Sequence, residues 1–238
     1  MQIIGHRGAR GEAPENTLSG FRYLHTLGIR AVEFDIHVAG DGQLVVIHDD
    51  SLERTTLTTG LIKDKTTAEL AAVDACHRSF VDWPNGDGVP SLEDVLNVLA
   101  DFEHLQLEVK AKTSQDCQII AQQLAVLCQP FGSRAVTTSF NLDYLHLMQQ
   151  TQPQIARGLL VEANFTGDII ALAQQLGCAL IAPHHSLYSA DLVAQAHALG
   201  MTTSTWTVNE PERMLALQAM GLDSLITDYP RRALALFA

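Results

Sequence analysis

A basic face is missing from this sequence. Its 238 residues include 15 lysines and arginines against 27 aspartates and glutamates, which gives a formal net charge of −12. Nucleic acids and anionic membrane surfaces bind proteins that gather positive charge, so the composition argues against both as partners. No apolar run reaches the roughly 20 residues that a membrane-spanning helix needs, and we expect no membrane insertion.

Signals for export and for cross-linking are also scarce. The first residues lead directly into an apolar stretch, without the basic region that opens a secretory signal, so we expect a cytoplasmic protein. The sequence has four cysteines, and none of them forms a Cys-x-x-Cys pair. We therefore expect reduced cysteines that pack in the interior. No short repeat and no low-complexity tract is visible.

Apolar strands alternate with amphipathic helical segments along the chain. Hydrophobic residues make up 47% of the sequence and charged residues 18%, which is typical of a globular enzyme. Strands are predicted at 2–5, 31–36, 105–110, 135–139, 155–161, 178–182, 202–208 and 224–227. A helix is expected after each of them, and Asn209 is expected to cap the helix that follows the seventh strand.

Eight strand–helix units in one chain indicate a parallel sheet with right-handed crossovers. This predicts an α/β fold, a closed (β/α)8 TIM barrel in a single domain over 1–238. A β-hairpin and a small insertion at about 50–90 follow the second strand, and a connection of that length is usually functional. A doubly wound open sheet is the alternative, although no Gly-x-Gly-x-x-Gly follows the first strand.

The stretch from Glu33 to Asp49 carries the clearest chemistry. Glu33 and Asp35 share one face of the second strand, because side chains alternate across a strand. Two neighbouring carboxylates repel each other unless a cation lies between them or one is protonated, and such oxygen ligands suit Mg²⁺ or Ca²⁺. A turn at Gly40-Asp41-Gly42 would set position 35 opposite position 48 and bring His48 beside the acids. The alternative is a solvated hairpin with surface acids and an unrelated histidine.

Other polar residues stand at the strand ends, where a (β/α)8 barrel places its active site. The candidates are His6 and Arg7 on the first strand, Glu33 and Asp35 on the second with His48 beside them, Glu108 and Lys110 on the third, and Trp206 on the seventh. Three carboxylates would hold a divalent metal, and two cations would hold an anionic substrate such as a phosphate ester. Two histidines can divide the acid and base roles near neutral pH.

Each of these residues also has a structural explanation when it is taken singly. His6 could be a hydrogen-bonded residue at a strand end, Lys110 could form an ion pair with Glu108, and Trp206 could belong to the core. Their convergence at the ends of neighbouring strands favours a common functional site.

A set of motifs in this chain resembles the glycerophosphodiester phosphodiesterase family. The motifs occur in that family's order and span nearly the whole chain: His6-Arg7-Gly8, Pro14-Glu15-Asn16-Thr17, Glu33-Phe34-Asp35, His48-Asp49, Leu52-x-Arg54-Thr55-Thr56, Glu108-Val109-Lys110, Trp206-Thr207-Val208-Asn209 and Ile226-Thr227-Asp228-Tyr229-Pro230.

The resemblance implies a (β/α)8 barrel with a small insertion after the hairpin. It also implies hydrolysis of a glycerophosphodiester, such as glycerophosphocholine or glycerophosphoethanolamine, to sn-glycerol 3-phosphate and an alcohol. The roles that it implies are a divalent metal (Ca²⁺ or Mg²⁺) on Glu33, Asp35 and Glu108, acid–base catalysis by His6 and His48, phosphate binding by Arg7 and Lys110, and a glycerol contact at Trp206.

Several questions stay open at this point. We favour His6 as the base and His48 as the acid, but the roles can be reversed, and the nucleophile is either water or the substrate's 2-hydroxyl. The headgroup, the native metal and the oligomeric state are undetermined. Two alternatives are a lysophospholipase D-like enzyme, against which the acidic charge argues, and a non-catalytic phosphodiester-binding barrel, which would not need both histidines.

Overall fold

The chain alternates strands and helices in the predicted order. The computed structural model describes residues 1–237. The strands are β1 (Gln2–His6), β2 (Ala31–Val38), β3 (Leu44–Val46), β4 (His104–Val109), β5 (Ala135–Ser139), β6 (Ala156–Val161), β7 (Leu180–Pro183), β8 (Thr202–Thr203) and β9 (Ser224–Thr227). The α-helices are α1 (Leu18–Thr26), α2 (Thr67–Ala71), α3 (Leu92–Val98), α4 (Ser114–Leu127), α5 (Leu142–Thr151), α6 (Ile169–Gln175), α7 (Ala190–Ala198), α8 (Pro211–Ala219) and α9 (Pro230–Phe237).

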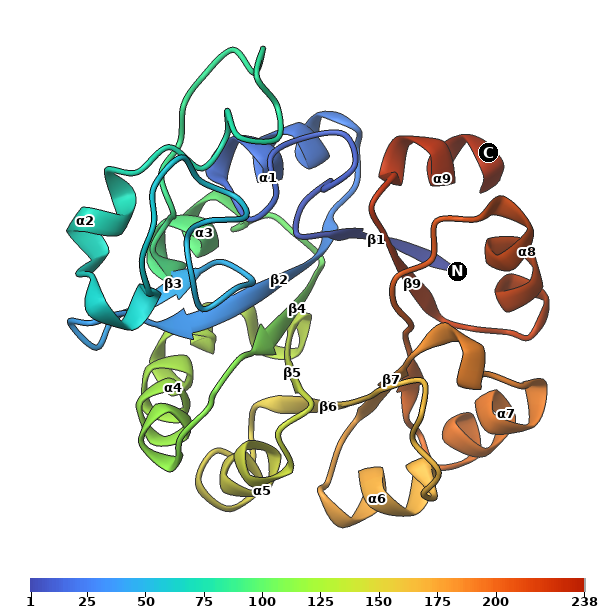
Figure 1. The fold of residues 1–238 in the computed structure, drawn as a ribbon. Coiled ribbons are helices and arrows are strands. Elements are labelled where there is room, and N and C mark those ends of the chain that lie inside the picture. The colour runs from blue at the N-terminus through green and yellow to red at the C-terminus, as the bar shows by residue number, and fades with distance from the viewer. Residues whose placement is uncertain (238) are drawn as a thin grey trace.

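The parallel strands form a (β/α)8 barrel, as predicted. Their order is β8, β7, β6, β5, β4, β2, β1, β9, and Figure 1 shows them at the centre with the helices around them. The barrel closes through the segment after β8. The Ile226 N–H donates to the Thr205 carbonyl (2.8 Å), and the Val208 N–H donates to the Ile226 carbonyl (2.9 Å).

Strand β2 shows how the sequence separates packing from chemistry. Val32, Phe34 and Ile36 are fully buried in the main hydrophobic core. Glu33 and Asp35 alternate with them and face the barrel interior. One face of the strand therefore stabilises the fold by burying apolar area, while the other supplies carboxylates to the cavity.

Short polar side chains begin most of the helices. A hydroxyl, amide or carboxylate oxygen accepts a backbone N–H from the first turn at Thr17, Thr66, Ser91, Thr113, Asn141, Asp168 and Ser189. At the start of α1 the capping residue is Thr17. Across residues 1–237, none of the helices combines the length and the apolar character that crossing a membrane requires.

Strands β2 and β3 form the predicted hairpin in a different register. Ile36 pairs with Val46, and the Ile47 N–H donates to the Asp35 carbonyl (3.1 Å). The expected pairing of position 35 with position 48 is therefore wrong by one residue. His48 lies beyond the last residue pair of the β2–β3 ladder. The orientation of its side chain is therefore set by the segment that leaves the hairpin after β3.

The segment from 50 to 90 packs beside the barrel and next to α1 (Figure 1). It contains α2 and a short 3-10 turn (Ile62–Asp64). Its interior, shared with the hairpin, is a second apolar cluster that includes Val45, Ile47, Leu52, Ile62, Leu70 and Val89. Two hydrogen bonds tie it to α1: the Trp83 indole donates to the Ser19 hydroxyl (3.0 Å), and the Ser19 N–H donates to Asp87 (2.6 Å).

The region of β8 differs from the prediction in two respects. The expected strand at 202–208 is regular only at Thr202–Thr203, and Trp206 lies beyond it with a single bridge to His184. Asn209 does not cap α8, whose N-cap residue is Glu210 and carries no side-chain capping bond. The Asn209 amide is used instead by Asp228, which explains why it is not free for the helix.

Candidate active site

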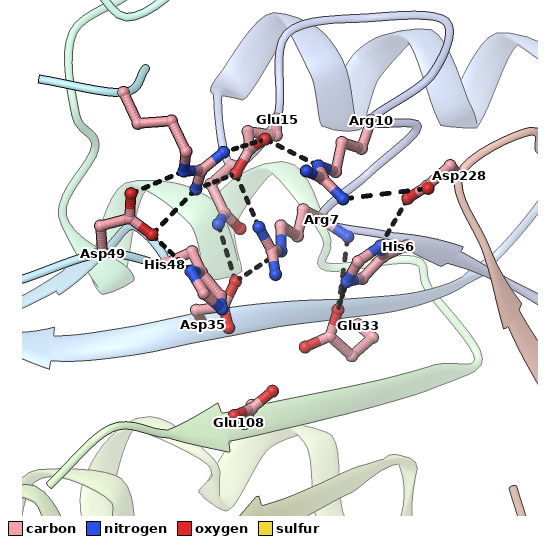
Figure 2. Close-up of polar contacts among 12 residues, drawn as sticks. His6, Arg7, Arg10, Glu15, Glu33, Asp35, His48, Asp49, Glu108 and Asp228 are labelled. Atoms are coloured by element: carbon pink, nitrogen blue, oxygen red, sulfur yellow. Dashed lines mark hydrogen bonds and ion pairs between the residues drawn. The ribbon is translucent and has the colours of Figure 1, made fainter. Parts of the chain in front are cut away.

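A cavity of about 230 Å³ opens at the C-terminal ends of the barrel strands. Its walls include His6, Arg7, Glu33, His48, Glu108, Lys110 and Trp206, which are seven of the eight predicted site residues. The eighth, Asp35, is fully buried and lies within reach of Arg7 and Lys110. Figure 2 shows how most of these side chains converge from β1, β2 and β4.

The strand register brings the inward-facing side chains together. His6 of β1 pairs with Glu33 of β2, and Asp35 of β2 pairs with Glu108 of β4. Neighbouring strands lie roughly 4.8 Å apart. Four titratable side chains therefore share one small region of the barrel mouth.

The connection between β1 and α1 holds two residues in a strained conformation. Arg7 has φ 50° and Asn16 has φ 54°, in the left-handed region that residues other than glycine rarely adopt. The Asn16 N–H donates to the Arg7 carbonyl (2.9 Å), so the two strained residues are joined. Gly5 permits this tight path, because a Cβ there would lie 2.0 Å from the Gly8 carbonyl oxygen. Strain of this kind concentrates at functional sites.

Three carboxylates form the acidic centre of the cavity. Glu33, Asp35 and Glu108 each offer an oxygen, and these oxygens lie within 4.8 Å of one another. Burial, together with the charge of Asp35, raises the pKa of Glu33 well above its ordinary value and that of Glu108 to about 7. Burial alone would also raise the pKa of Asp35, but the charges of Arg7 and Lys110 hold it well below its usual range.

The same cluster meets the requirements of a divalent cation. Oxygen atoms of Glu33 and Asn16 are buried without a hydrogen-bond partner in the described part of the chain, and the buried Oδ1 of Asp35 has only its ion pair with Lys110. Buried polar atoms normally have partners, so the two unpartnered oxygens point to a group that the protein atoms do not supply. Hard oxygen donors of this kind suit Mg²⁺ or Ca²⁺. The residues therefore fit the metal that the sequence predicts.

His6 is held by a carboxylate from the far end of the chain. Its Nδ1 lies 2.6 Å from Asp228 Oδ1, and its Nε2 lies 3.9 Å from Glu33. Because a carboxylate only accepts, the proton resides on Nδ1 and Nε2 is left for chemistry. The Asn209 amide in turn donates to the other Asp228 oxygen (2.8 Å) and accepts the Asp228 N–H. Burial lowers the pKa of His6, although the bond to Asp228 opposes the shift.

His48 is held in the same manner by its neighbour in the sequence. Its Nδ1 lies 2.6 Å from Asp49 Oδ1, and Arg54 Nε donates to Asp49 Oδ2 (2.6 Å). His37 supports the backbone here, since its Nε2 donates to the His48 carbonyl (2.9 Å). Burial lowers the pKa of His48 as well. Its side chain is 34% exposed against 9% for His6, so His48 exchanges protons with solvent more readily.

Glu15 links the two histidine–carboxylate pairs. Its carboxylate accepts hydrogen bonds from Arg7 (2.9 Å), Arg10 (3.0 Å) and Arg54 (2.9 Å). Arg54 also binds Asp49, so this network reaches from the His48 side to Arg10, above His6 (Figure 2). Burial would raise the pKa of Glu15, but the bonds from Arg54 and the charge of Arg7 lower it to about 2.

The two predicted phosphate-binding cations are both committed to carboxylates. Arg7 Nε lies 3.1 Å from Asp35. The Lys110 ammonium lies 3.2 Å from Asp35 and forms a closer ion pair with Glu108. The ion pair that was an alternative interpretation of Lys110 is therefore present. Both side chains nevertheless line the cavity, where a substrate anion would share them.

Trp206 forms the apolar end of the cavity. Its indole N–H donates to the Ala182 carbonyl (2.8 Å), which fixes the ring. Phe140 and His184 each meet the ring edge-on, with centroids 5.4 Å away. The indole therefore offers a rigid apolar wall to whatever group binds beside it.

The residues that sequence reasoning missed lie next to those it found. They are Glu15, Asn16, Asp49, Asn209 and Asp228, all within the quoted motifs. Asn209 was interpreted as a helix cap, because asparagine favours that position. Sequence proximity to His48 was the available signal for Asp49. No local pattern places Asp228 beside His6, because only barrel closure joins the first and last strands.

Comparison with known proteins gives a consistent result. A family model described as "Glycerophosphoryl diester phosphodiesterase family" matches residues 6–232. A glycerophosphodiester phosphodiesterase of Bacillus altitudinis is 30% identical over 98% of this chain and 96% of its own length. The solved structure of an Oleispira antarctica phosphodiesterase, in complex with the product sn-glycerol-3-phosphate, is 32% identical. It has a TM-score of 0.90 and covers 100% of this chain and 96% of its own.

Proposed function

Because this chain belongs to the glycerophosphoryl diester phosphodiesterase family, and so is a phosphodiester hydrolase, we propose the following reaction. The protein hydrolyses glycerophosphodiesters, glycerophosphocholine and glycerophosphoethanolamine among them, to sn-glycerol 3-phosphate and the free alcohol. The observation that carries the proposal is the pair of carboxylate-held imidazoles, His6 and His48, on the walls of one small cavity that Glu33 and Glu108 also line, with Asp35 buried beside them.

Glu33, Asp35 and Glu108 would hold a divalent cation, Ca²⁺ or Mg²⁺. The close approach of their oxygens and the unpartnered buried oxygen of Glu33 support this assignment. When bound, the cation supplies positive charge against the phosphate oxygens, whose negative charge grows in the transition state. The pKa values of Glu33 and Glu108 are raised by burial and by neighbouring acids, so ionising all three carboxylates requires such a cation.

The two histidines would move the protons. Each imidazole carries a proton on Nδ1, which it donates in a hydrogen bond to a carboxylate, and presents Nε2 to the substrate. His6, deeply buried with a lowered pKa, suits the base that activates water or the substrate's 2-hydroxyl. His48, more exposed, suits the acid that protonates the leaving alkoxide and is then recharged by solvent. Acid–base help of this kind contributes about 10²–10⁴-fold to the rate.

Arg7 and Lys110 would bind the phosphate, and Trp206 would contact the glycerol. Arg7 is anchored by Glu15 and Asp35, so its guanidinium enters the reaction already oriented. Such preorganised charge costs no rearrangement when the transition state forms. Binding of a phosphodiester alone would not require two imidazoles with fixed tautomers, and their presence favours turnover.

The experiment is a release assay on the full chain with Ca²⁺ or Mg²⁺ present. Purified protein is mixed with glycerophosphocholine or glycerophosphoethanolamine, and sn-glycerol 3-phosphate is followed with a coupled dehydrogenase. We expect release from both diesters. Failure to release it from any glycerophosphodiester with any divalent metal would contradict the proposal, and lysophospholipids would then be the substrates to test.

A further inference from the structure

His48 borders a second cavity, which adjoins the catalytic one and has a volume of about 450 Å³. We call it the side cavity. The residues that line both cavities are His48, Glu108, Lys110, Phe140 and Glu162. His6 and Trp206 line the catalytic cavity but not the side cavity. The two spaces therefore meet on the His48 side of the site, and the reaction as proposed gives the side cavity no role.

The proposed acid determines where the leaving alcohol lies. A general acid must come within about 2.6–3.2 Å of the oxygen that it protonates, so the leaving oxygen lies beside His48 Nε2. The carbon chain on that oxygen extends away from the phosphorus and from the glycerol at Trp206. The side cavity has His48 in its wall and Trp206 outside it, so it can receive this chain. The cavity at Arg10 and Phe80 is lined by neither histidine.

Two neighbouring strands bring an aromatic ring and a carboxylate to the side cavity. Phe140 directly follows β5, and Glu162 directly follows β6. These strands pair in parallel, with Ser139 opposite Leu159, and Figure 1 shows them side by side. The carboxyl ends of parallel barrel strands lie at the same end of the barrel. Phe140 and Glu162 therefore belong to one rim, between the catalytic cavity and the side cavity.

Glu162 gives the side cavity a negative charge that no cation of the protein offsets. The other acids of its wall form ion pairs: Asp49 with His48 and Arg54, Asp50 with Lys112, and Glu108 with Lys110. Glu162 is exposed, and within residues 1–237 its carboxylate makes neither an ion pair nor a hydrogen bond. It also lies outside the acidic cluster of Glu33, Asp35 and Glu108. A ligand in the side cavity therefore meets one uncompensated carboxylate.

The Phe140 ring adds a surface that also favours a cation. The side chain is 36% exposed and meets Trp206 at an interplanar angle of 86°. The rings that carry an arginine within residues 1–237 are those of Phe102, Phe131, Tyr23 and Tyr229. Ammonium groups are attracted to the faces of aromatic rings. A ring without a cation and a carboxylate without a partner on the same rim suit an ammonium group.

We propose that the side cavity binds the headgroup of the leaving alcohol, and that Glu162 and Phe140 select headgroups with an ammonium group over neutral ones of the same shape. Glu162 is then a specificity-determining residue, which contacts the headgroup and not the reacting atoms. The inference rests on the proposed function and on His48 as its acid. It names the preferred substrate class of that reaction, the diesters of amino alcohols.

The test compares kcat/KM for glycerophosphocholine and for the matching diester of neohexyl alcohol, in which a tert-butyl group replaces trimethylammonium. The two headgroups have the same shape and differ in charge. The metal-loaded full chain is used at low ionic strength, and release of sn-glycerol 3-phosphate is the readout. The wild type should prefer the choline diester by at least about fivefold, the combined value of an exposed ion pair and a cation–ring contact.

The ratio of the two kcat/KM values in variants locates the origin of this preference. The ammonium group also makes choline the better leaving alcohol, so the change in the ratio between variants is the decisive quantity. Glu162→Gln should lower the ratio about three- to fivefold, and Phe140→Leu about twofold. Asp143→Asn removes the same charge from an exposed residue that lines neither cavity, and it should keep the ratio and the basal activity of the wild type.

A general loss of stability or of metal affinity acts on both diesters and cancels in the ratio. Roughly 1 M salt should lower the ratio of the wild type toward that of Glu162→Gln, because salt screens exposed charges. A wild-type ratio of one or less, a Glu162→Gln variant with the wild-type ratio, or an equal effect of Asp143→Asn would overturn the inference and leave the proposed function standing. Turnover of neither diester would contradict both.

Discussion

Replacing Asp228 with asparagine tests how the His6 tautomer is fixed. Asp228 accepts the His6 Nδ1 proton with one oxygen and an N–H of the Asn209 amide with the other. Asn209 cannot turn around, because its Oδ1 accepts the Asp228 N–H (3.0 Å) and the Thr227 hydroxyl (3.1 Å). In Asp228→Asn, an amide oxygen turned toward His6 would leave the amide nitrogen facing the N–H of Asn209, so that two donors would meet. We therefore expect the opposite orientation, in which the new amide oxygen accepts from Asn209 and the new amide N–H faces His6 Nδ1. That N–H donor forces the imidazole proton of His6 onto Nε2.

The size of the effect follows from what that proton blocks. A His6 protonated at Nε2 and unprotonated at Nδ1 cannot act as a base toward the cavity. The variant should lose the acid–base contribution of one histidine, about 10²–10⁴-fold in kcat, which is about 3–5 kcal/mol of barrier. The substrate contacts are unchanged, so KM should change little. The assay is steady-state release of sn-glycerol 3-phosphate, with thermal unfolding as the check on folding.

A second substitution provides the matched rescue. In Asp228→Asn combined with Asn209→Asp, the new carboxylate at 209 accepts the amide N–H groups at 228, and the amide oxygen turns back toward His6 Nδ1. We expect the double variant to recover at least about tenfold in kcat over Asp228→Asn. Full kcat in the single variant, or a double variant no better than the single, would refute the tautomer argument.

Three further predictions follow from the same site. His6→Ala and His48→Ala should each lower kcat at least about 100-fold in the release assay, and full activity in both would exclude the acid–base assignment. Ca²⁺ or Mg²⁺ at a hundredfold excess over its Kd should stabilise the chelated protein by about 3 kcal/mol, and Glu33→Gln should weaken this shift in thermal unfolding. Glu15→Gln should lower the free energy of urea unfolding by roughly 3 kcal/mol at pH 7, because the pKa of Glu15 falls from 4.5 to about 2 on folding. A carboxyl group whose pKa is lowered by folding stabilises the fold at pH values above its pKa in the unfolded chain. The difference in the free energy of unfolding between wild type and variant should therefore shrink as the pH falls from about 4.5 toward 2. A difference that stayed constant with pH would contradict ionisation of Glu15 as its cause.

Much of the barrel could be predicted because its signal is local. The alternation of Val32, Phe34 and Ile36 with Glu33 and Asp35 specifies a strand, its packed face and its chemical face together. Repetition of such units leads to a closed barrel. The single-domain organisation over 1–238 and the roles of the site residues stay predictions.

The features that could not be predicted depend on contacts between distant segments. The hairpin register shifted by one residue because a turn of glycines and aspartate tolerates more than one geometry. Strand β8 is short because the segment after it bonds to β9 and β7 irregularly. Asn209 and Asp228 received no catalytic prediction, because their partnership with His6 exists only after the first and last strands have paired.

The most direct measurement is metal-restored turnover. The protein is treated with chelator, the chelator is removed, and release of sn-glycerol 3-phosphate from a glycerophosphodiester is recorded as Ca²⁺ or Mg²⁺ is added back. We predict loss of activity on chelation, saturable recovery with the metal, and a weakened response in Glu33→Gln, whose carboxylate belongs to the acidic cluster. Full activity of the chelated protein, or a response to metal that Glu33→Gln leaves unchanged, would contradict the assignment of the metal to Glu33, Asp35 and Glu108.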